Sequence, residues 1–197
     1  MSKAGKSCRH SGAVGSKPTR VTRHLMDNYG PEVGKVLDFG SGKVPRQTEL
    51  LRQAGFDVHA TDLPENHVIG VHATPRAVYI DTAWDVVLVS NVLNVQASPD
   101  RAAELIANLI RVKKPRVIIF NLPNAPVHWT EPGIVEHIGP GGRRRLLDDR
   151  LMGALRAKDY RMMQKHPYSG GVVYVIDNGQ DLKEQPQIRG CMFPTRG

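Results

Sequence analysis

The sequence predicts an α/β fold, a doubly wound and mostly parallel sheet that ends in an antiparallel hairpin. Strand-length apolar runs alternate with helical patterns through most of the chain, which is the order of strand, helix, strand units. Two of these runs, "DVVLVSNVL" and "RVIIFNL", are rich in Val, Leu and Ile, as parallel strands buried on both faces are. A turn of Ser169, Gly170 and Gly171 separates the last two strand patterns and predicts the hairpin.

In the first half of the chain, apolar spacing and turn residues define each element. Val21, Leu25 and Tyr29 recur at four-residue intervals, which indicates a helix that Gly30 and Pro31 end. "KVLDFG" then predicts a strand, "PRQTELLRQAG" a helix and "DVHATD" a second strand. The expected elements are a helix at 16–29, strands at 35–40 and 57–62 with a helix at 45–55 between them, and a short third strand, "AVYID", at 77–81.

In the second half, "SPDRAAELIANLIRVKK" carries complete helix signals. Ser98 is the candidate cap, Pro99 stands in the first turn, apolar residues repeat on one face and cations end the segment. The other expected elements are strands at 85–93 and 116–122, a helix at 141–158, and hairpin strands at 160–167 and 170–177.

Length and composition predict one domain with short tails. The chain has 197 residues, 40% of them hydrophobic, which is enough for one substantial core. We expect a mobile basic tail at 1–15, the domain at 16–180 and a C-terminal tail at 181–197. No apolar stretch has membrane-spanning length and no signal core precedes the domain, so a cytoplasmic protein is expected. Cys8 and Cys191 lack metal-like spacing, and no metal site is predicted.

The basic charge of the chain leaves its partner open. A net charge of +8 would suit a nucleic acid, since Lys and Arg neutralise phosphates. Basic residues collect in the first 24 positions and at Arg143 to Arg145, without the interleaved aromatic residues that stack bases. A solvated basic surface is therefore favoured over a nucleic-acid site.

The turn after the first strand is a candidate ligand site. Ligands of doubly wound sheets sit outside the carboxyl ends of the strands, and Gly40 and Gly42 would let the backbone approach a ligand there. A dinucleotide fingerprint wants a third glycine where Pro45 stands, and "GSGKVP" lacks the Gly-Lys-Ser/Thr of a P-loop. Asp38 and Asp62, at the ends of two neighbouring strands, add carboxylates that bind a vicinal diol or a cation.

Residues 35–122 resemble the core of a class I S-adenosylmethionine-dependent methyltransferase. "VLDFGSGK" is similar to the first motif of that family, "HATD" to its second, and "DVVLVSNVLNVQ" to its fourth-strand motif. "SNVLNV" is also similar to sequences of small bacterial and phage methyltransferases of unassigned substrate. The resemblance implies the Rossmann-like methyltransferase fold, with S-adenosylmethionine as cofactor.

The resemblance also implies roles for individual residues. Asp38 would orient the ammonium group of the cofactor, and Asp62 would hold its two ribose hydroxyls. Leu63 would pack against the adenine, although the short "DTAW" loop departs from the family where other adenine contacts would lie. The implied cofactor-binding set is Asp38, Phe39, Gly40, Ser41, Gly42, Asp62, Leu63, Asp81, Ser90 and Asn91.

The methyl acceptor is left open, as is the oligomeric state. A small molecule, a protein or a nucleic acid would each fit, and no catalytic residue is assigned. Asn94, the "NLPN" segment at 121–124, His128 and Trp129 are further candidates near the strand ends, each with a purely structural reading beside it. The rival interpretations are a catalytically inactive cofactor-binding or nucleic-acid- or protein-binding module on the same fold, and a nicotinamide-dependent enzyme.

Overall fold

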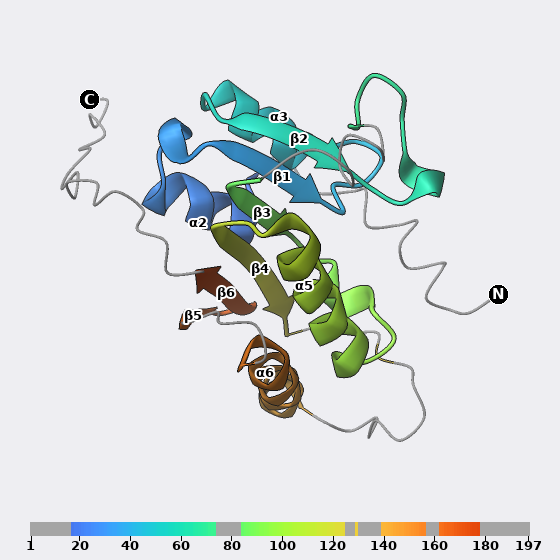
Figure 1. Cartoon of the computed structure of the whole chain (residues 1–197), viewed down its shortest axis with the longest axis vertical. Helices are drawn as coiled ribbons and strands as arrows, with labels where there is room; N and C mark the ends of the chain where they lie inside the picture. Colours follow the sequence, from blue (N-terminus) through green and yellow to red (C-terminus); the bar gives the residue numbers. More distant parts are fainter. Residues whose placement is uncertain (1–16, 74–83, 125–128, 130–138, 157–161, 178–197) are drawn as a thin grey trace.

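The computed structural model describes residues 17–73, 84–124, 129, 139–156 and 162–177, and these form one sheet with helices on both faces (Figure 1). The sheet has six strands in the order β2-β1-β3-β4-β6-β5. In chain order the strands are β1 Lys35–Phe39, β2 Asp57–Thr61, β3 Val86–Val89, β4 Val117–Pro123, β5 Met162–Tyr168 and β6 Gly171–Asp177.

The strand directions confirm the predicted fold class. β2, β1, β3 and β4 run parallel, β6 runs antiparallel to β4, and β5 closes the sheet as the antiparallel partner of β6. Strand order reverses at β1, because the strands that follow it in sequence lie on its two sides. The expected strand at 77–81 and the expected tails at 1–15 and 181–197 lie outside the described residues, so the proposed domain bounds of 16–180 stay a prediction.

The helices and short 3-10 turns follow the predicted pattern with shifted ends. The helices are α2 Arg20–Asn28, α3 Arg46–Gln53, α5 Pro99–Lys113 and α6 Pro140–Arg156, and the 3-10 turns are η1 Pro31–Val33, η2 Pro64–Asn66 and η3 Leu93–Val95. The first helix starts later than expected because Thr19 caps it, its Oγ1 accepting from the Thr22 N–H at 3.2 Å. β3 is shorter than expected because Asn91 has a φ of 57°.

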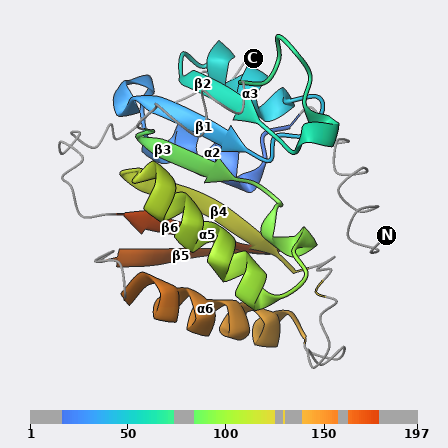
Figure 2. The same ribbon diagram turned by 45° about the vertical axis from the view of Figure 1, so that its right-hand side comes forward.

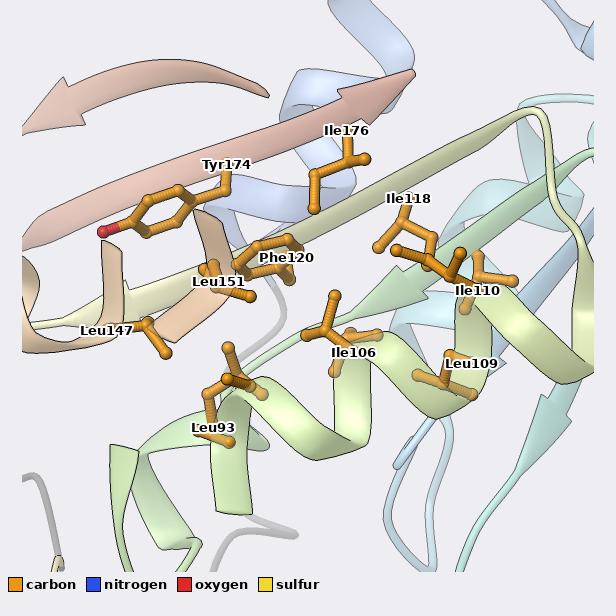
Figure 3. Packing of buried hydrophobic residues seen from close by; sticks show 14 of the residues in the cluster. Leu93, Ile106, Leu109, Ile110, Ile118, Phe120, Leu147, Leu151, Tyr174 and Ile176 are labelled. Atoms are coloured by element: carbon orange, nitrogen blue, oxygen red, sulfur yellow. The ribbon is translucent and has the colours of Figure 1, made fainter. Parts of the chain in front are cut away.

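Two apolar layers enclose the sheet. α2 and α3 cover one face, where Val21, Leu25 and Leu51 pack against Val36 and other inward side chains of the sheet. α5 and α6 cover the opposite face (Figure 2). Figure 3 shows this second layer, in which the Phe120 and Tyr174 rings stack 4.9 Å apart between the helices and the sheet. Burial on both faces explains the nearly unbroken apolar runs of β3 and β4.

Helix α5 has the ends that its sequence predicts. The Ser98 hydroxyl accepts from the Arg101 N–H at 3.2 Å, and Pro99 is the first helical residue. Lys114 follows the helix in the left-handed conformation, where the chain turns toward β4. Among the described residues, no helix combines the length and apolar content needed to cross a membrane.

Candidate functional site

A cavity of about 710 Å³ opens at the carboxyl ends of β1, β2 and β3, next to the reversal of strand order. This is where open α/β sheets bind ligands, and the volume is in the range of cofactor and small-molecule sites. The predicted residues Asp38, Phe39, Gly40, Ser41, Gly42, Asp62, Leu63, Ser90 and Asn91 all line it. Asp81, the remaining member of the predicted set, lies outside the described residues.

The glycine turn forms one wall of the cavity. Gly40 and Gly42 each have a φ of 78°, a conformation that side chains disfavour. The Gly40 and Ser41 N–H groups donate to the Thr61 carbonyl oxygen at 2.9 and 3.1 Å, which ties the turn to the end of β2. A Cβ on Gly40 would collide with the side chain of Val92, which adjoins it in the cavity wall. The turn therefore needs glycine at Gly40 for its backbone angle and for its close packing.

Asp38 is a buried carboxylate beneath this turn. Its Oδ2 accepts from the Thr48 hydroxyl at 2.6 Å, and the residue is 3% exposed. Burial raises the pKa of Asp38 from 3.8 to about 6, with the Asp62 carboxylate adding to the rise and Thr48 and His72 opposing it. A carboxyl group that is buried in a cavity wall, where its ionisation is unfavourable, is suited to binding a cationic ligand group.

The raised pKa of Asp38 predicts how stability depends on pH. The folded protein keeps a proton on Asp38 between about pH 4 and pH 6, whereas the unfolded chain has lost it. The free energy of unfolding should therefore fall as the pH rises through this window, by at most about 3 kcal/mol from this group. Urea unfolding of the wild type and of Asp38→Asn at pH 4 to 7 measures it, since the variant lacks the titrating group. Identical slopes in the two proteins would contradict the prediction.

Asp62 joins three parts of the cavity wall. Its Oδ2 accepts from the Gly42 N–H at 2.5 Å. Its Oδ1 accepts from the Leu63 N–H and from the Asn66 amide, each at 2.8 Å. The carboxylate thus fixes the glycine turn to the start of η2, and it lies in the wall of the cavity. Leu63, 49% exposed, supplies an apolar surface beside it.

The sequence reasoning missed a polar network that closes the other side of the site. The Thr19 N–H donates to Gln47 Oε1 at 2.8 Å, and the Ser90 hydroxyl donates to Thr19 Oγ1 at 3.1 Å. Thr19 and Gln47 both line the cavity, so the start of α2 is part of the site. The sequence offered one signal for Thr19, because it can cap a helix by accepting from the N–H of Thr22. No local sequence pattern points to Gln47. The remaining lining residues that were not predicted are Thr61, Pro64, Asn66, His67, Val92, Val95, Gln96 and Leu105.

His72 supports the glycine turn from behind. Its Nδ1 accepts from the Val68 N–H at 3.0 Å, so Nε2 carries the proton and donates to the Gly42 carbonyl oxygen at 2.8 Å. The residue is 5% exposed, and the His67 ring lies 5.5 Å from the His72 ring. His72 is therefore a buried bridge between the segment after β2 and the glycine turn.

Replacing His72 with Phe should lower the free energy of unfolding by about 1 to 3 kcal/mol, because it leaves two backbone groups without their partner. Chemical denaturation measures the loss. His67→Phe is the matched control, since His67 makes a single 3.3 Å contact to the Ala73 carbonyl oxygen. An equal loss in both variants would show that ring polarity in this segment, rather than the bridge, sets the effect.

Asn91 and Asn121 pair across the ends of β3 and β4. The Asn91 N–H donates to Asn121 Oδ1, and Asn121 Nδ2 donates to Asn91 Oδ1, both at 2.8 Å. Asn121 is buried, so "NLPN" begins with a residue that holds the cavity wall rather than one that lines it. Asn124 ends the segment by donating to the Gly170 carbonyl oxygen at 2.8 Å. Residues 121–123 belong to β4 and pair with β6, so "NLPN" is mainly the end of a strand and not the turn that the sequence predicted.

The other candidates lie apart from the cavity. Asn94 is buried in η3, and Trp129 packs against the apolar layer of α5 and α6. Neither is among the described residues that line the cavity, and His128 lies outside the described residues. Within the part of the chain that the structure describes, no group of three His, Cys, Asp or Glu side chains could hold a metal ion.

Comparisons with known proteins identify the fold. No protein family model matches the sequence, and no curated protein matches it either. A SAM dependent methyltransferase from Archaeoglobus fulgidus matches with a TM-score of 0.54 and 15% identity, over 80% of this chain and 92% of that chain. A putative O-methyltransferase from Nostoc punctiforme PCC 73102 matches with a TM-score of 0.51 and 15% identity, over 80% of this chain and 55% of that chain.

A chain from the structure of the Pnkp1/Rnl/Hen1 RNA repair complex also matches, with a TM-score of 0.55 and 13% identity, over 81% of this chain and 42% of that chain. The chain thus spans nearly the whole length of the archaeal protein but about half or less of the other two. At these identities the likeness concerns architecture. The protein has the Rossmann-like fold of class I S-adenosylmethionine-dependent methyltransferases.

Proposed function

We propose that this protein is an S-adenosylmethionine-dependent methyltransferase that transfers a methyl group by direct displacement. One observation carries the proposal: every described residue of the cofactor-binding set predicted from the motifs lines a single cavity at the switch point of the sheet. The methyltransferase fold supports it independently, because the fold likeness was found without reference to those residues.

The residues of the cavity fit the proposed cofactor. Asp38, buried and without a cationic side chain in its hydrogen bonding, would hold the ammonium group. Asp62 would accept from the ribose hydroxyls, and Leu63 would cover the adenine, with Asp81 near its exocyclic amine. Gly40 and Gly42 keep the wall free of side chains where the methionine part would pass. Ser90 and Asn91 would border its far side, at the end of β3.

Methyl transfer by displacement mainly requires that the methyl group and the acceptor atom be aligned. When bound, S-adenosylmethionine supplies a methyl group already activated by the positive sulfonium. The chain would hold that group at the mouth of the cavity, in line with the acceptor atom. Catalysis would then come mainly from bringing the two reacting atoms together in the right orientation. No general base is assigned to a residue, because an anionic acceptor or a neutral amine would attack the activated methyl group through a free lone pair. Any proton on the methylated acceptor atom would then be lost to solvent.

Calorimetric titration tests cofactor binding. S-adenosylmethionine and its demethylated product should bind with a one-to-one stoichiometry, whereas NAD should not, because Pro45 occupies the third-glycine position. Binding of NAD alone would favour the nicotinamide-dependent reading. Heat from none of the three ligands would remove the proposal.

Methyl-labelled cofactor then tests transfer. The protein is incubated with a fractionated cell lysate, and label is sought in RNA, DNA, protein and small molecules. Transfer into one fraction names the acceptor class. Cofactor binding without label in any fraction would favour the inactive binding module on the same fold.

A further inference from the structure

Basic residues stand at the carboxyl edge of the sheet, the edge at which the cavity opens. Lys43 follows the glycine turn, Arg46 begins α3 and Arg20 begins α2 directly after the cavity residue Thr19. Arg143, Arg144 and Arg145 stand in the first turns of α6. In Figure 2 the start of α6 lies on the same side of the molecule as the arrowheads of β1, β3 and β4. We name these six residues the basic rim.

Two of the helices carry these charges near their N-termini, where a positive charge destabilises a helix. α2 and α6 have no acidic residue in the first turn; α2 begins with Arg20, and Arg143 follows Pro140, Gly141 and Gly142 in α6. A positive charge at a helix N-terminus is unfavourable, since the dipole there is also positive. α5 follows the opposite and favourable rule, with Asp100 in its first turn and Arg111 and Lys113 in its last. The helix dipole therefore does not account for these arginines.

Contacts hold two of these arginines at the carboxyl edge of the sheet. The Arg20 guanidinium lies 5.1 Å from the centre of the Tyr168 ring. The Tyr168 hydroxyl is 3.5 Å from Asn121 Nδ2, and Asn121 pairs with Asn91 in the cavity wall. Arg143 donates to the Asn124 carbonyl oxygen at 2.6 Å, at the end of β4. A charge held in place this way loses less conformational freedom when it binds an anion.

Three acids on α5 and α6 pair with cations outside the basic rim. On α5, Glu104 pairs with Arg101 at 2.8 Å and Asp100 pairs with Arg150 at 2.8 Å. On α6, Asp148 pairs with Lys165 at 2.6 Å. Each of these pairs uses a cation that is not part of the basic rim. The Asp62 carboxylate is engaged by the glycine turn.

The basic rim is too wide for one small anion. α3 connects β1 to β2, whereas α6 packs against β4 and β6, which lie two and three strand positions from β1. With about 4.8 Å between strands, the two groups of charges are about 10 Å or more apart. A ligand that contacts both must carry several separated negative charges. A phosphodiester chain does this, with a base or sugar atom between phosphates available to the cavity mouth.

We propose that the basic rim binds a nucleic acid strand and that a nucleotide of this strand is the methyl acceptor. A lone pair on a nitrogen or oxygen of that nucleotide would form the new bond to the methyl carbon as the S–CH3 bond breaks. The demethylated cofactor would leave with the electron pair of that bond, and a proton on the acceptor atom would pass to solvent. The acceptor role rests on the proposed function, whereas the binding of a nucleic acid strand does not. The sequence alone favoured a solvated basic surface, because its cations are scattered along the chain. The fold gathers them at the edge of the sheet where the cofactor is expected.

Fluorescence anisotropy with labelled single-stranded RNA, single-stranded DNA and duplex DNA of about 20 nucleotides tests the proposal, at salt concentrations from about 50 to 200 mM. The triple variant Arg20→Gln, Arg144→Gln, Arg145→Gln should weaken binding at least tenfold and flatten the slope of log K against log salt by about 2. The matched control, Lys35→Gln, Arg111→Gln, Lys114→Asn, removes the same charge at the opposite ends of β1 and α5. The affinity of this control for the nucleic acid should fall less than threefold.

Equal losses in the two triple variants would overturn the proposal, because only net charge would then matter. Binding to vesicles of anionic lipid, with no binding to any nucleic acid, would also overturn the proposal. Calorimetry with S-adenosylmethionine separates this outcome from failure of the proposed function, since both triple variants keep the cavity residues. The strand bound most tightly, mixed with methyl-labelled cofactor, should become labelled by the wild type and by the control.

Discussion

Gly40→Ala is expected to abolish measurable cofactor binding and to lower the free energy of unfolding by roughly 2 to 5 kcal/mol. Two costs add in this variant. A φ of 78° costs an alanine about 1 to 2 kcal/mol, and the new methyl group collides with Val92 inside the wall of the cavity. Calorimetric titration with S-adenosylmethionine and denaturant unfolding measure the two effects.

Gly70→Ala separates these costs. Gly70 has a φ of 81°, but a Cβ there meets nothing within 4 Å, so only the backbone term of about 1 to 2 kcal/mol should remain. Adding Val92→Ala to Gly40→Ala removes the colliding side chain and should restore part of the stability. If Gly40→Ala behaved like Gly70→Ala and still bound the cofactor, the close packing of Gly40 against Val92 would not matter for function.

Asp62→Ala is expected to raise the dissociation constant of S-adenosylmethionine by about 5-fold to 150-fold, corresponding to about 1 to 3 kcal/mol. The variant removes the acceptor proposed for the ribose hydroxyls. It also releases the Gly42 N–H, so the glycine turn loses its tie to η2. Titration calorimetry at fixed pH measures the constant.

Asn66→Ala is the control for the structural part of this effect. It removes one of the hydrogen bonds that position Asp62 and leaves the carboxylate in place. A loss of less than tenfold is expected there. Equal losses in the two variants would mean that Asp62 acts only by shaping the wall, and an unchanged constant in Asp62→Ala would exclude it from the site.

Local sequence signals were sufficient for the elements and for the centre of the site. Ser98, Pro99 and the spaced apolar residues of α5 act within one or two turns, so the helix could be located without its neighbours. The same holds for Asp38, Gly40 and Gly42, because one strand and the turn after it place all three. Asp62 could be added because a parallel neighbour strand must end at the same edge.

Residues placed by long-range contacts could not be predicted. Thr19 reaches Gln47 and Ser90, which are 28 and 71 residues away in sequence. His72 bridges Val68 and Gly42 only because the segment after β2 folds back beneath the glycine turn. Asn121 looked like part of a turn motif, and its pairing with Asn91 required β4 to lie beside β3. Such contacts depend on the completed sheet rather than on any local pattern.

The described residues that line the cavity lie between Thr19 and Leu105. Strands β4, β6 and β5 and helix α6 come later in the chain, and they support the sheet and carry the arginines of α6. The cofactor cavity and the part of the basic rim on α6 are therefore encoded in separate stretches of the gene, whereas Arg20, Lys43 and Arg46 of the basic rim lie in the same stretch as the cavity. Acceptor preference could change by mutation or recombination in the later stretch while the cofactor cavity is kept, and chimaeras that exchange α6 are a practical route to new acceptors.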